Sequence, residues 1–259
     1  MIFKISISPE CPNIVKVSMG MKNIAEMKKQ GSQGVLDRIF PNQEATPSEG
    51  YDMAIEFDCD SLSNPAEYLE NISNLKTHVM GGPIERALSA LASKSSSSTA
   101  PIVINYRKEE SYFVCPGASK VTVIFLVDFE DVTDKALARV FLQEFAESQR
   151  SVRTAPPVSY SKEPPLEIAN ISFPYNKDCA GFISFALEES HVAGDKKAGA
   201  VSLMSCFRNY LHYHIKSSKT YLHMRMRKKV VGWLKVLNRA IPETEKEKKT
   251  AAGKTFTRK

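Results

Sequence analysis

Apolar residues recur along the chain with two periods, which predict a repeated order of strands and helices. In the first half, residues 15–21 and 53–57 alternate between apolar and polar or small side chains, as half-buried strands do. An amphipathic helical segment follows each of them, at residues 24–40 and from about Pro65 onwards. We expect the Gly-Gly-Pro sequence at residues 81–83 to break the second helix.

The second half repeats this order. Residues 102–106 and 112–114 read as short strands, and residues 121–127, VTVIFLV, are apolar on both faces, which is typical of a central strand. A helix follows over residues 133–145, and residues 181–187, GFISFAL, form another strand. We therefore predict an α+β fold of two similar small α/β domains with antiparallel-rich sheets, although α+β chains also share this order by chance.

The domain boundaries follow from composition. The serine run in residues 94–101, KSSSSTAP, buries no apolar surface and divides the chain near residue 98. This gives a first domain at residues 1–98 and a second at 99–199. A long C-terminal helix at 200–241 and a charged tail at 242–259 complete the chain.

The C-terminal helix carries a continuous apolar seam. From Ala198 to Ala240 there is no proline, and about forty residues at 1.5 Å each give a helix about 60 Å long. A domain of roughly 100 residues is about half as wide, so the seam needs a second partner. Apolar residues recur at steps of three, four or seven at Phe207, Leu211, Ile215, Leu222, Met226, Val230, Trp233 and Leu237.

Charge is distributed unevenly. The 259 residues sum to +6, but residues 208–259 hold fifteen Lys or Arg and three Glu, or +12, so residues 1–207 sum to −6. A basic C-terminal fifth predicts an anionic partner, and nucleic acid, acidic lipid and an acidic protein surface all suit it. A basic helix face is also commonly just solvated. The clustered residues in this segment are Arg225, Arg227, Lys228, Lys229, Lys235 and Arg239.

No arrangement for catalysis or metal binding stands out. His212 and His214 are two residues apart, so they point away from each other on a helix, and no acid joins them or His223 at ligand spacing. There is no glycine-rich phosphate loop and no G-x-S-x-G elbow. Five cysteines without a C-x-x-C pair indicate reduced thiols. No apolar run is long enough to span a membrane. We expect neither an enzyme nor a cofactor.

Several sequences in the second half resemble one known family. Residues 211–229, LHYHIKSSKTYLHMRMRKK, and 234–240, LKVLNRA, resemble the C-terminal helix of subunit 2 of the actin-related protein 2/3 complex. Further similar sequences are TAP at 154–156, SKEPPLE at 161–167, FLQEF at 141–145, GKTF at 253–256 and SEGY at 48–51. The resemblance is strong from about Ile102 onwards and weaker before it. The family usually has a few dozen more N-terminal residues, including a first strand, and this chain begins close to a later strand.

This resemblance implies a structural, actin-filament-binding subunit rather than an enzyme. In the family, two similar α/β domains precede a long helix, which pairs with a helix of subunit 4 and touches the mother filament during nucleation of branched actin filaments. Nucleotide is bound by other subunits. The resemblance thus assigns the eight seam residues to the subunit 4 interface and the six clustered cations to the filament, in the cytoplasmic, cortical actin network. The alternative is a basic nucleic-acid-binding module, but no zinc finger, RNP aromatics or helix-turn-helix accompanies the charge.

Overall fold

The computed structural model describes residues 2–8, 10–94, 100–107, 110–148, 151–152, 154–240, 248–249 and 255–256. The chain forms two units, Met1–Ile215 and Lys216–Lys259. The boundary predicted at residue 98 lies outside the described residues, and the division of the first unit into domains 1–98 and 99–199 stays a prediction. Of the predicted tail, only two short paired strands are described, β10 (Lys248–Lys249) and β11 (Thr255–Phe256).

An antiparallel sheet with the order β1-β2-β4-β3 forms the first half of the first unit. Its strands are β1 (Ile2–Ser8), β2 (Cys11–Gly20), β3 (Glu44–Ala45) and β4 (Met53–Asp58). The predicted strands at residues 15–21 and 53–57 are confirmed as β2 and β4, although Met21 lies just beyond β2. Strand β1 was not predicted; it lies at the edge of the sheet, with Ile5 opposite Val17.

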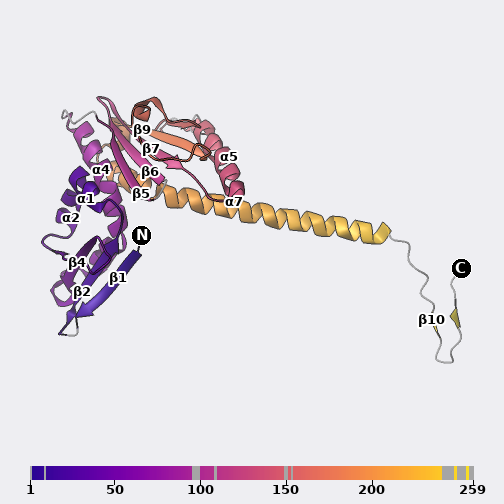
Figure 1. The fold of residues 1–259 in the computed structure, drawn as a ribbon, viewed down its shortest axis with the longest axis horizontal. Coiled ribbons are helices and arrows are strands. Elements are labelled where there is room, and N and C mark those ends of the chain that lie inside the picture. Colours follow the sequence, from indigo (N-terminus) through magenta and orange to yellow (C-terminus); the bar gives the residue numbers. More distant parts are fainter. Residues whose placement is uncertain are drawn as a thin grey trace. The chain divides into compact units, whose positions relative to one another are not determined.

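Helices cover one face of this sheet (Figure 1). They are α1 (Ile24–Met27), the π-helical turn η1 (Lys28–Ser32), α2 (Gln33–Ile39), α3 (Pro65–Ser73) and α4 (Leu75–Ala92); the 3-10 turn η2 (Cys59–Ser61) precedes α3. The amphipathic segment predicted at 24–40 changes direction at Gly31, whose φ of 132° suits glycine alone. Helix α3 begins at Pro65, as predicted, and the side chain of Asn64 caps it.

The predicted break at residues 81–83 is wrong, because α4 continues through Gly81, Gly82 and Pro83. Proline leaves the carbonyl four residues earlier without its helical partner, and here the Ser32 hydroxyl donates to the Val79 carbonyl at 2.5 Å. The two glycines allow close packing on both sides of α4. A Cβ at Gly82 would lie 2.4 Å from Ser32 Cα, and one at Gly81 would lie 2.6 Å from Val201 Cγ1.

The second half contains an antiparallel sheet with the order β5-β6-β7-β9-β8 (Figure 1). Its strands are β5 (Ile102–Arg107), β6 (Glu110–Pro116), β7 (Lys120–Val127), β8 (Val158–Ser161) and β9 (Gly181–Glu188). The helical elements are α5 (Val132–Ser148), η4 (Leu166–Ile168), α6 (Glu189–Val192) and α7 (Lys196–Ala240). Strand β7 pairs with both β6 and β9, which confirms the central strand predicted at residues 121–127.

The two sheets share one topology. In the first half a hairpin (β1, β2) is followed by helices and two further strands in the order β1-β2-β4-β3; in the second, the hairpin β6–β7 is followed by α5 and two strands in the order β6-β7-β9-β8. Strand β5, at the outer edge of β6, has no counterpart among the described strands of the first half. This shared order supports two similar α/β units, and the α+β fold is confirmed.

The main apolar core runs through both halves. It contains Met19 and Ile55 from the first sheet, Ile84 from α4, and Phe125 from the second sheet. A smaller cluster, including Phe113 and Ile168, covers the opposite face of the second sheet. The second sheet is therefore buried on both faces, which explains why residues 121–127 of β7 carry apolar side chains on both faces.

Candidate protein-interaction surface

The beginning of α7 belongs to the core of the first unit. Phe207, Leu211 and Ile215 are 4%, 1% and 1% exposed. The Phe207 ring lies 4.8 Å from that of Phe125 and 5.0 Å from that of Phe185, measured between centroids. The chain itself therefore covers three of the eight seam residues predicted to meet a partner.

Polar contacts fix the same part of α7 to the unit. The guanidinium of Arg208 donates from Nε and Nη2 to both carboxylate oxygens of Glu110 on β6. Burial alone would lower the pKa of Arg208, but hydrogen bonding and the charge of Glu110 outweigh it, and the pKa is raised. Lys197 donates to the Ser89 hydroxyl at 3.2 Å. Residues 196–215 are thus anchored by charge as well as by packing.

The histidines of α7 lie against aromatic rings. The His212 ring is 4.3 Å from that of Phe129, and the His214 ring is 4.2 Å from that of Tyr210. No group of three or more His, Cys, Asp or Glu in the described part of the chain could hold a metal ion. All five cysteines are free, with Cys11 and Cys59 exposed. Both histidines therefore serve packing.

The second unit contains the other five seam residues, and all are exposed. The exposed fractions are 39% for Leu222, 61% for Met226, 52% for Val230, 72% for Trp233 and 63% for Leu237. With 3.6 residues per turn, these five side chains fall within an arc of about 80° around the helix. We call them the apolar arc. Large apolar side chains in solvent at one face of a helix are typical of a surface that binds another protein.

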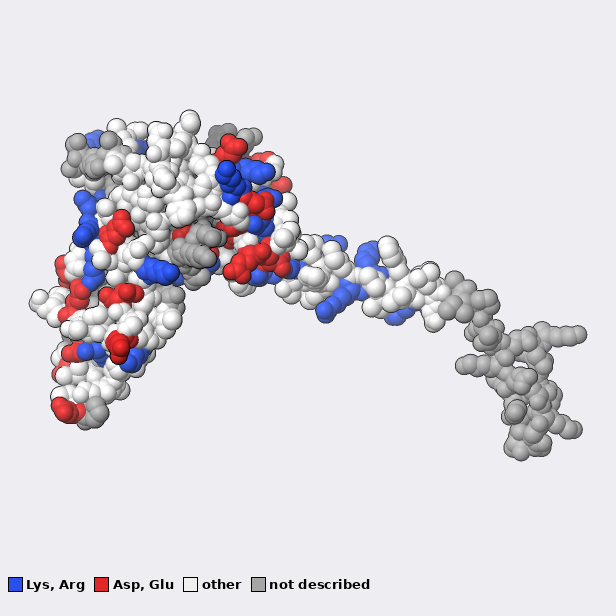
Figure 2. Space-filling view, viewed as in Figure 1, with Lys and Arg blue, Asp and Glu red and all other residues white. Residues whose placement is uncertain are grey.

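All charged residues in the same segment are basic. Residues 216–240 contain eight Lys or Arg and no Asp or Glu, and Figure 2 shows blue side chains without red ones along this helix. The six predicted filament contacts all lie here. Of these, Arg225, Lys228, Lys235 and Arg239 fall within about 80° of one another, centred about 140° from the centre of the apolar arc. We call these four the basic face.

The remaining two cations lie closer to the apolar arc. Lys229 is about 20° beyond the edge of the arc at Leu222, and Arg227 is about 60° beyond the edge at Val230. The guanidinium of Arg225, by contrast, lies 5.6 Å from the Tyr221 ring centroid on the opposite side of the helix. The structure therefore separates six cations that look equivalent in sequence.

Comparison with known proteins gives this surface a context. Residues 17–244 match the family model P34-Arc, described as the Arp2/3 complex 34 kD subunit p34-Arc. The chain belongs to this family. It is 37% identical over 274 aligned positions to "Actin-related protein 2/3 complex subunit 2" of Schizosaccharomyces pombe, covering 97% of this chain and 86% of that protein. It is 33% identical over 244 positions to the protein of the same name from Dictyostelium discoideum, covering 93% and 82%.

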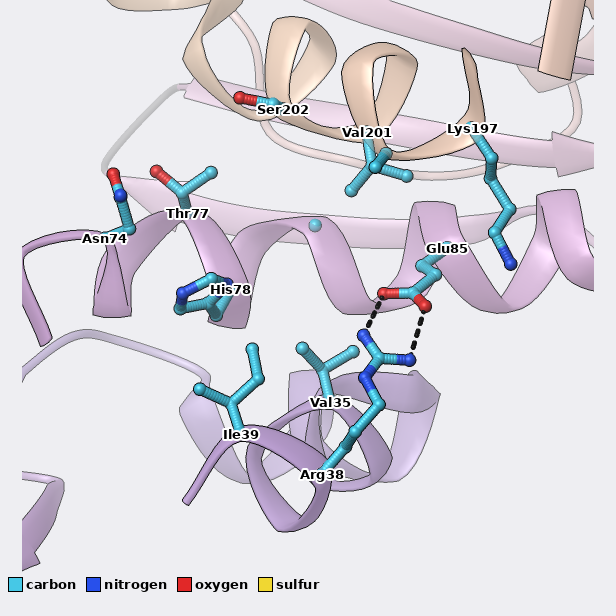
Figure 3. Close-up of a pocket in the computed structure, with 12 residues that line it drawn as sticks. Val35, Arg38, Ile39, Asn74, Thr77, His78, Glu85, Lys197, Val201 and Ser202 are labelled. Atoms are coloured by element: carbon cyan, nitrogen blue, oxygen red, sulfur yellow. Dashed lines mark hydrogen bonds and ion pairs between the residues drawn. The ribbon is translucent and has the colours of Figure 1, made fainter. Parts of the chain in front are cut away.

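A cavity that sequence analysis missed lies elsewhere in this p34-Arc family member. It measures about 270 Å³ and opens between α2, α4 and the first turns of α7 (Figure 3). Arg38 spans part of it and donates to both carboxylate oxygens of Glu85, at 2.7 and 3.0 Å. The His78 ring also faces it, and burial lowers the pKa of this imidazole. The lining mixes apolar side chains such as Val35, Ile39 and Val201 with polar ones, and its ion pair is closed on itself, which suits packing between helices. No signal in the sequence marks this cavity.

The ion pair between Arg38 and Glu85 predicts a pH-dependent stability. The hydrogen bond from Arg38 holds the pKa of Glu85 below the ordinary value of 4.5. The contribution of this ion pair to the free energy of unfolding is therefore present above pH 4.5. It is lost as the pH falls through the lowered pKa of Glu85. Glu85→Gln should cost about 1 kcal/mol at pH 7, and progressively less as the pH falls below 4.5 through the lowered pKa of Glu85. Urea unfolding of both proteins over a series of pH values from 7 downwards measures this, and a cost that stays constant until the protein unfolds in acid would contradict the assignment to charge.

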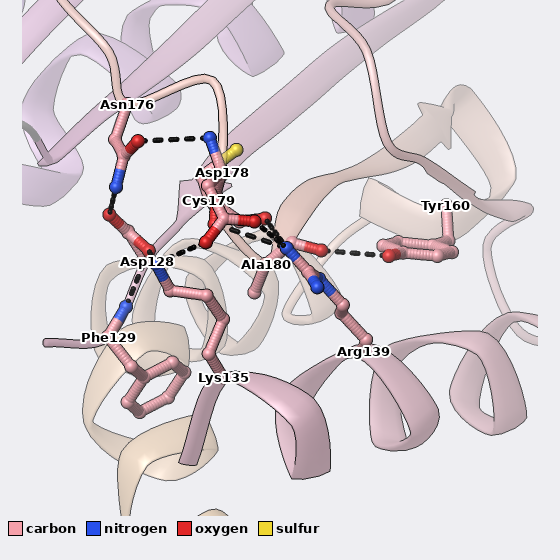
Figure 4. A network of polar contacts seen from close by, with 9 residues as sticks. All are labelled: Asp128, Phe129, Lys135, Arg139, Tyr160, Asn176, Asp178, Cys179 and Ala180. Carbon is pink, nitrogen blue, oxygen red and sulfur yellow. Dashed lines mark hydrogen bonds and ion pairs between the residues drawn. The ribbon is translucent and has the colours of Figure 1, made fainter. Parts of the chain in front are cut away.

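A second polar network ties α5 to the loop before β9 (Figure 4). Lys135 lies 3.2 Å from an oxygen of Asp128 and 3.6 Å from one of Asp178, and Arg139 donates to Asp178 at 2.8 Å. The hydrogen bond from Arg139, followed by the charge of Lys135, lowers the pKa of Asp178. Every group here has an opposite charge beside it and no nucleophile is activated. We therefore interpret the network as structural.

Proposed function

We propose that this chain is a structural subunit of the Arp2/3 complex, and that it pairs with subunit 4 through the apolar arc. The observation that carries the proposal is an exposed apolar arc on a helix whose preceding turns are already packed in the first unit. The family membership supports an assembly with other subunits, and the names of the relatives place those proteins in the same complex. Among the described helices, none is long and apolar enough to cross a membrane.

The basic face gives the second part of the proposal. We propose that it contacts the acidic side of the mother filament while branched actin filaments are nucleated in the cytoplasmic, cortical actin network. The apolar arc and the basic face point in different directions, so one helix serves both partners at once. Such contacts act between exposed charges and are screened over about 8 Å at physiological salt. Each pair contributes about 0–1 kcal/mol, so several cations have to act together.

Coexpression of the chain with the other subunits tests the scaffold role. A tagged chain should retain subunit 4 through purification at high salt, because burial of apolar surface is not weakened by screening. A chain that purifies alone and binds duplex DNA with a steep salt dependence would instead support the nucleic-acid-binding alternative.

Two double charge reversals separate the faces of the helix. Arg225→Glu with Lys228→Glu should weaken filament binding by the assembled complex by about 1–2 kcal/mol, or roughly fivefold to thirtyfold, and flatten its salt dependence. Arg227→Glu with Lys229→Glu changes the net charge equally but lies nearer the apolar arc, so it should weaken filament binding less. Cosedimentation with filaments at two salt concentrations measures both. Equal losses for the two pairs would show that net charge, and not the basic face, determines binding.

A further inference from the structure

The cavity between α2, α4 and the first turns of α7 has two polar ends and an apolar middle (Figure 3). At one end Arg38 and Glu85 pair with each other through two hydrogen bonds. The middle is lined by apolar side chains of α2 and α7, such as Ile39 and Val201. At the other end the imidazole of His78 faces the cavity. A ligand would therefore be recognised at the His78 end.

His78 presents an unused hydrogen-bond acceptor to this cavity. Its imidazole donates an N–H to the backbone of Asn71, and the ring of Phe40 packs against it with centroids 6.3 Å apart. Burial lowers the pKa of His78 below the ordinary value of 6.5, so the imidazole is neutral at pH 7 and Nε2 carries a lone pair. This buried Nε2 has no hydrogen-bond partner among the described residues. Because a buried acceptor without a donor is costly, the site favours a ligand that supplies one.

The size and lining of the cavity define the class of ligand. A cavity of about 150 Å³ is enough to hold a benzene ring, and this one measures about 270 Å³, so it has room for a substituted ring. At the far end Lys197 donates to the Ser89 hydroxyl, and its charge acts on Glu85 together with that of Arg38. The charges there already have partners, so a neutral ligand is favoured.

We propose that this cavity binds a neutral phenol-type group, with its ring in the apolar middle and its hydroxyl donating to Nε2 of His78. Such a group occurs in small aromatic molecules and in the tyrosine side chain of a neighbouring subunit. The inference goes beyond the proposed function, because the cavity involves neither the apolar arc nor the basic face. All of its lining residues lie in the first unit, so the full chain by itself contains the site.

Titration of the full chain with para-cresol tests the chemistry of the site. In protein with isotope-labelled histidine, the probe should move the imidazole resonances of His78, with a Kd on the order of 1 mM for so small a ligand. Toluene has the same methylated ring without the hydroxyl, so it should bind about twofold to tenfold more weakly, the size of one hydrogen bond. Unmoved His78 resonances, or equal affinity for the two probes, would overturn the proposal.

His78→Phe removes the acceptor but keeps an aromatic ring. This variant should lose the preference for para-cresol over toluene, followed through the backbone amide of Gly81, which also lines the cavity. The comparison of two probes within one variant is insensitive to a modest change in stability. A preference that survives in His78→Phe would show that another group receives the hydroxyl, and would overturn the assignment to Nε2.

A blocking variant locates the probe. Ser202 is exposed and lines the cavity, so Ser202→Trp should fold, place a large ring at the cavity and abolish para-cresol binding. Asn209→Trp is the matched control, because Asn209 is exposed two turns further along the same side of α7 and does not line the cavity. It should bind para-cresol like the parent. Equal binding by the two variants would place the probe elsewhere and overturn the proposal.

The complex reconstituted from defined subunits distinguishes the two sources of the phenol group. If a tyrosine of another subunit fills the cavity, saturation-transfer NMR should detect para-cresol on the isolated chain but not on the complex, and Ser202→Trp should weaken assembly. If a free molecule is the ligand, para-cresol should bind both, and Ser202→Trp should assemble like Asn209→Trp. Either result supports the site, whereas no binding to the isolated chain refutes it.

Discussion

Replacing Gly82 by alanine should destabilise the first unit by about 2–4 kcal/mol, the largest effect that we expect from a single methyl group. The new Cβ would lie 2.4 Å from Cα and 2.6 Å from the backbone nitrogen of Ser32. Backbone atoms of a neighbouring helical turn cannot move aside as a flexible side chain can. The same displacement would pull the Ser32 hydroxyl from the Val79 carbonyl, leaving that buried group without a partner.

Gly34→Ala is the matched control for this prediction. Gly34 also lies in a helix of the first unit, but a Cβ there would meet nothing within 4 Å. Alanine should therefore stabilise the protein by about 0.5–1 kcal/mol through its higher helix propensity. Urea unfolding followed by circular dichroism gives both values. A Gly82→Ala protein as stable as the parent would mean that α4 and η1 do not pack as closely as described.

The Gly-Gly-Pro sequence shows where reasoning from local sequence fails. Glycine and proline have low intrinsic helix propensity, and local rules place a break wherever three of them adjoin. The packing of η1 and α7 against α4 overrides that propensity, because only residues without a Cβ permit the approach. The compensating hydroxyl of Ser32 is 47 positions from Val79 in the sequence, so no local window contains it.

Strand β1 and the seam show two other limits. The sequence of β1, with Lys4, Ser6 and Ser8 between apolar residues, has the period of two that predicts a strand, and that signal was overlooked. The seam, by contrast, has the same apolar periodicity from Phe207 to Leu237, although its first three residues are buried and its last five are exposed. Periodicity reports which side of a helix is apolar but not what covers it, so the burial of Phe207 needed the tertiary structure.

The apolar arc gives the prediction with the largest effect on assembly. Met226→Asp should weaken association with subunit 4 by about 3 kcal/mol, over a hundredfold in Kd, because a carboxylate at the centre of a helix-pairing surface is desolvated without a partner. The first unit should stay folded, since Met226 is 61% exposed in the chain alone. Leu211→Asp would be uninformative, because Leu211 is 1% exposed in the core and its replacement would unfold the first unit.

Met224→Asp supplies a control that differs only in direction. Met224 is 57% exposed, has the same side chain and lies in the same turn, but it points about 160° away from the centre of the apolar arc. Val230→Asp and Val231→Asp form a second such pair, with exposed fractions of 52% and 51%. Copurification and a binding titration with subunit 4 should separate each pair, with losses only for Met226→Asp and Val230→Asp. If Met224→Asp and Val231→Asp weaken binding as much, the partner surrounds the helix and the apolar arc alone does not define the interface. If none of the four variants weakens binding, subunit 4 binds another surface of this chain.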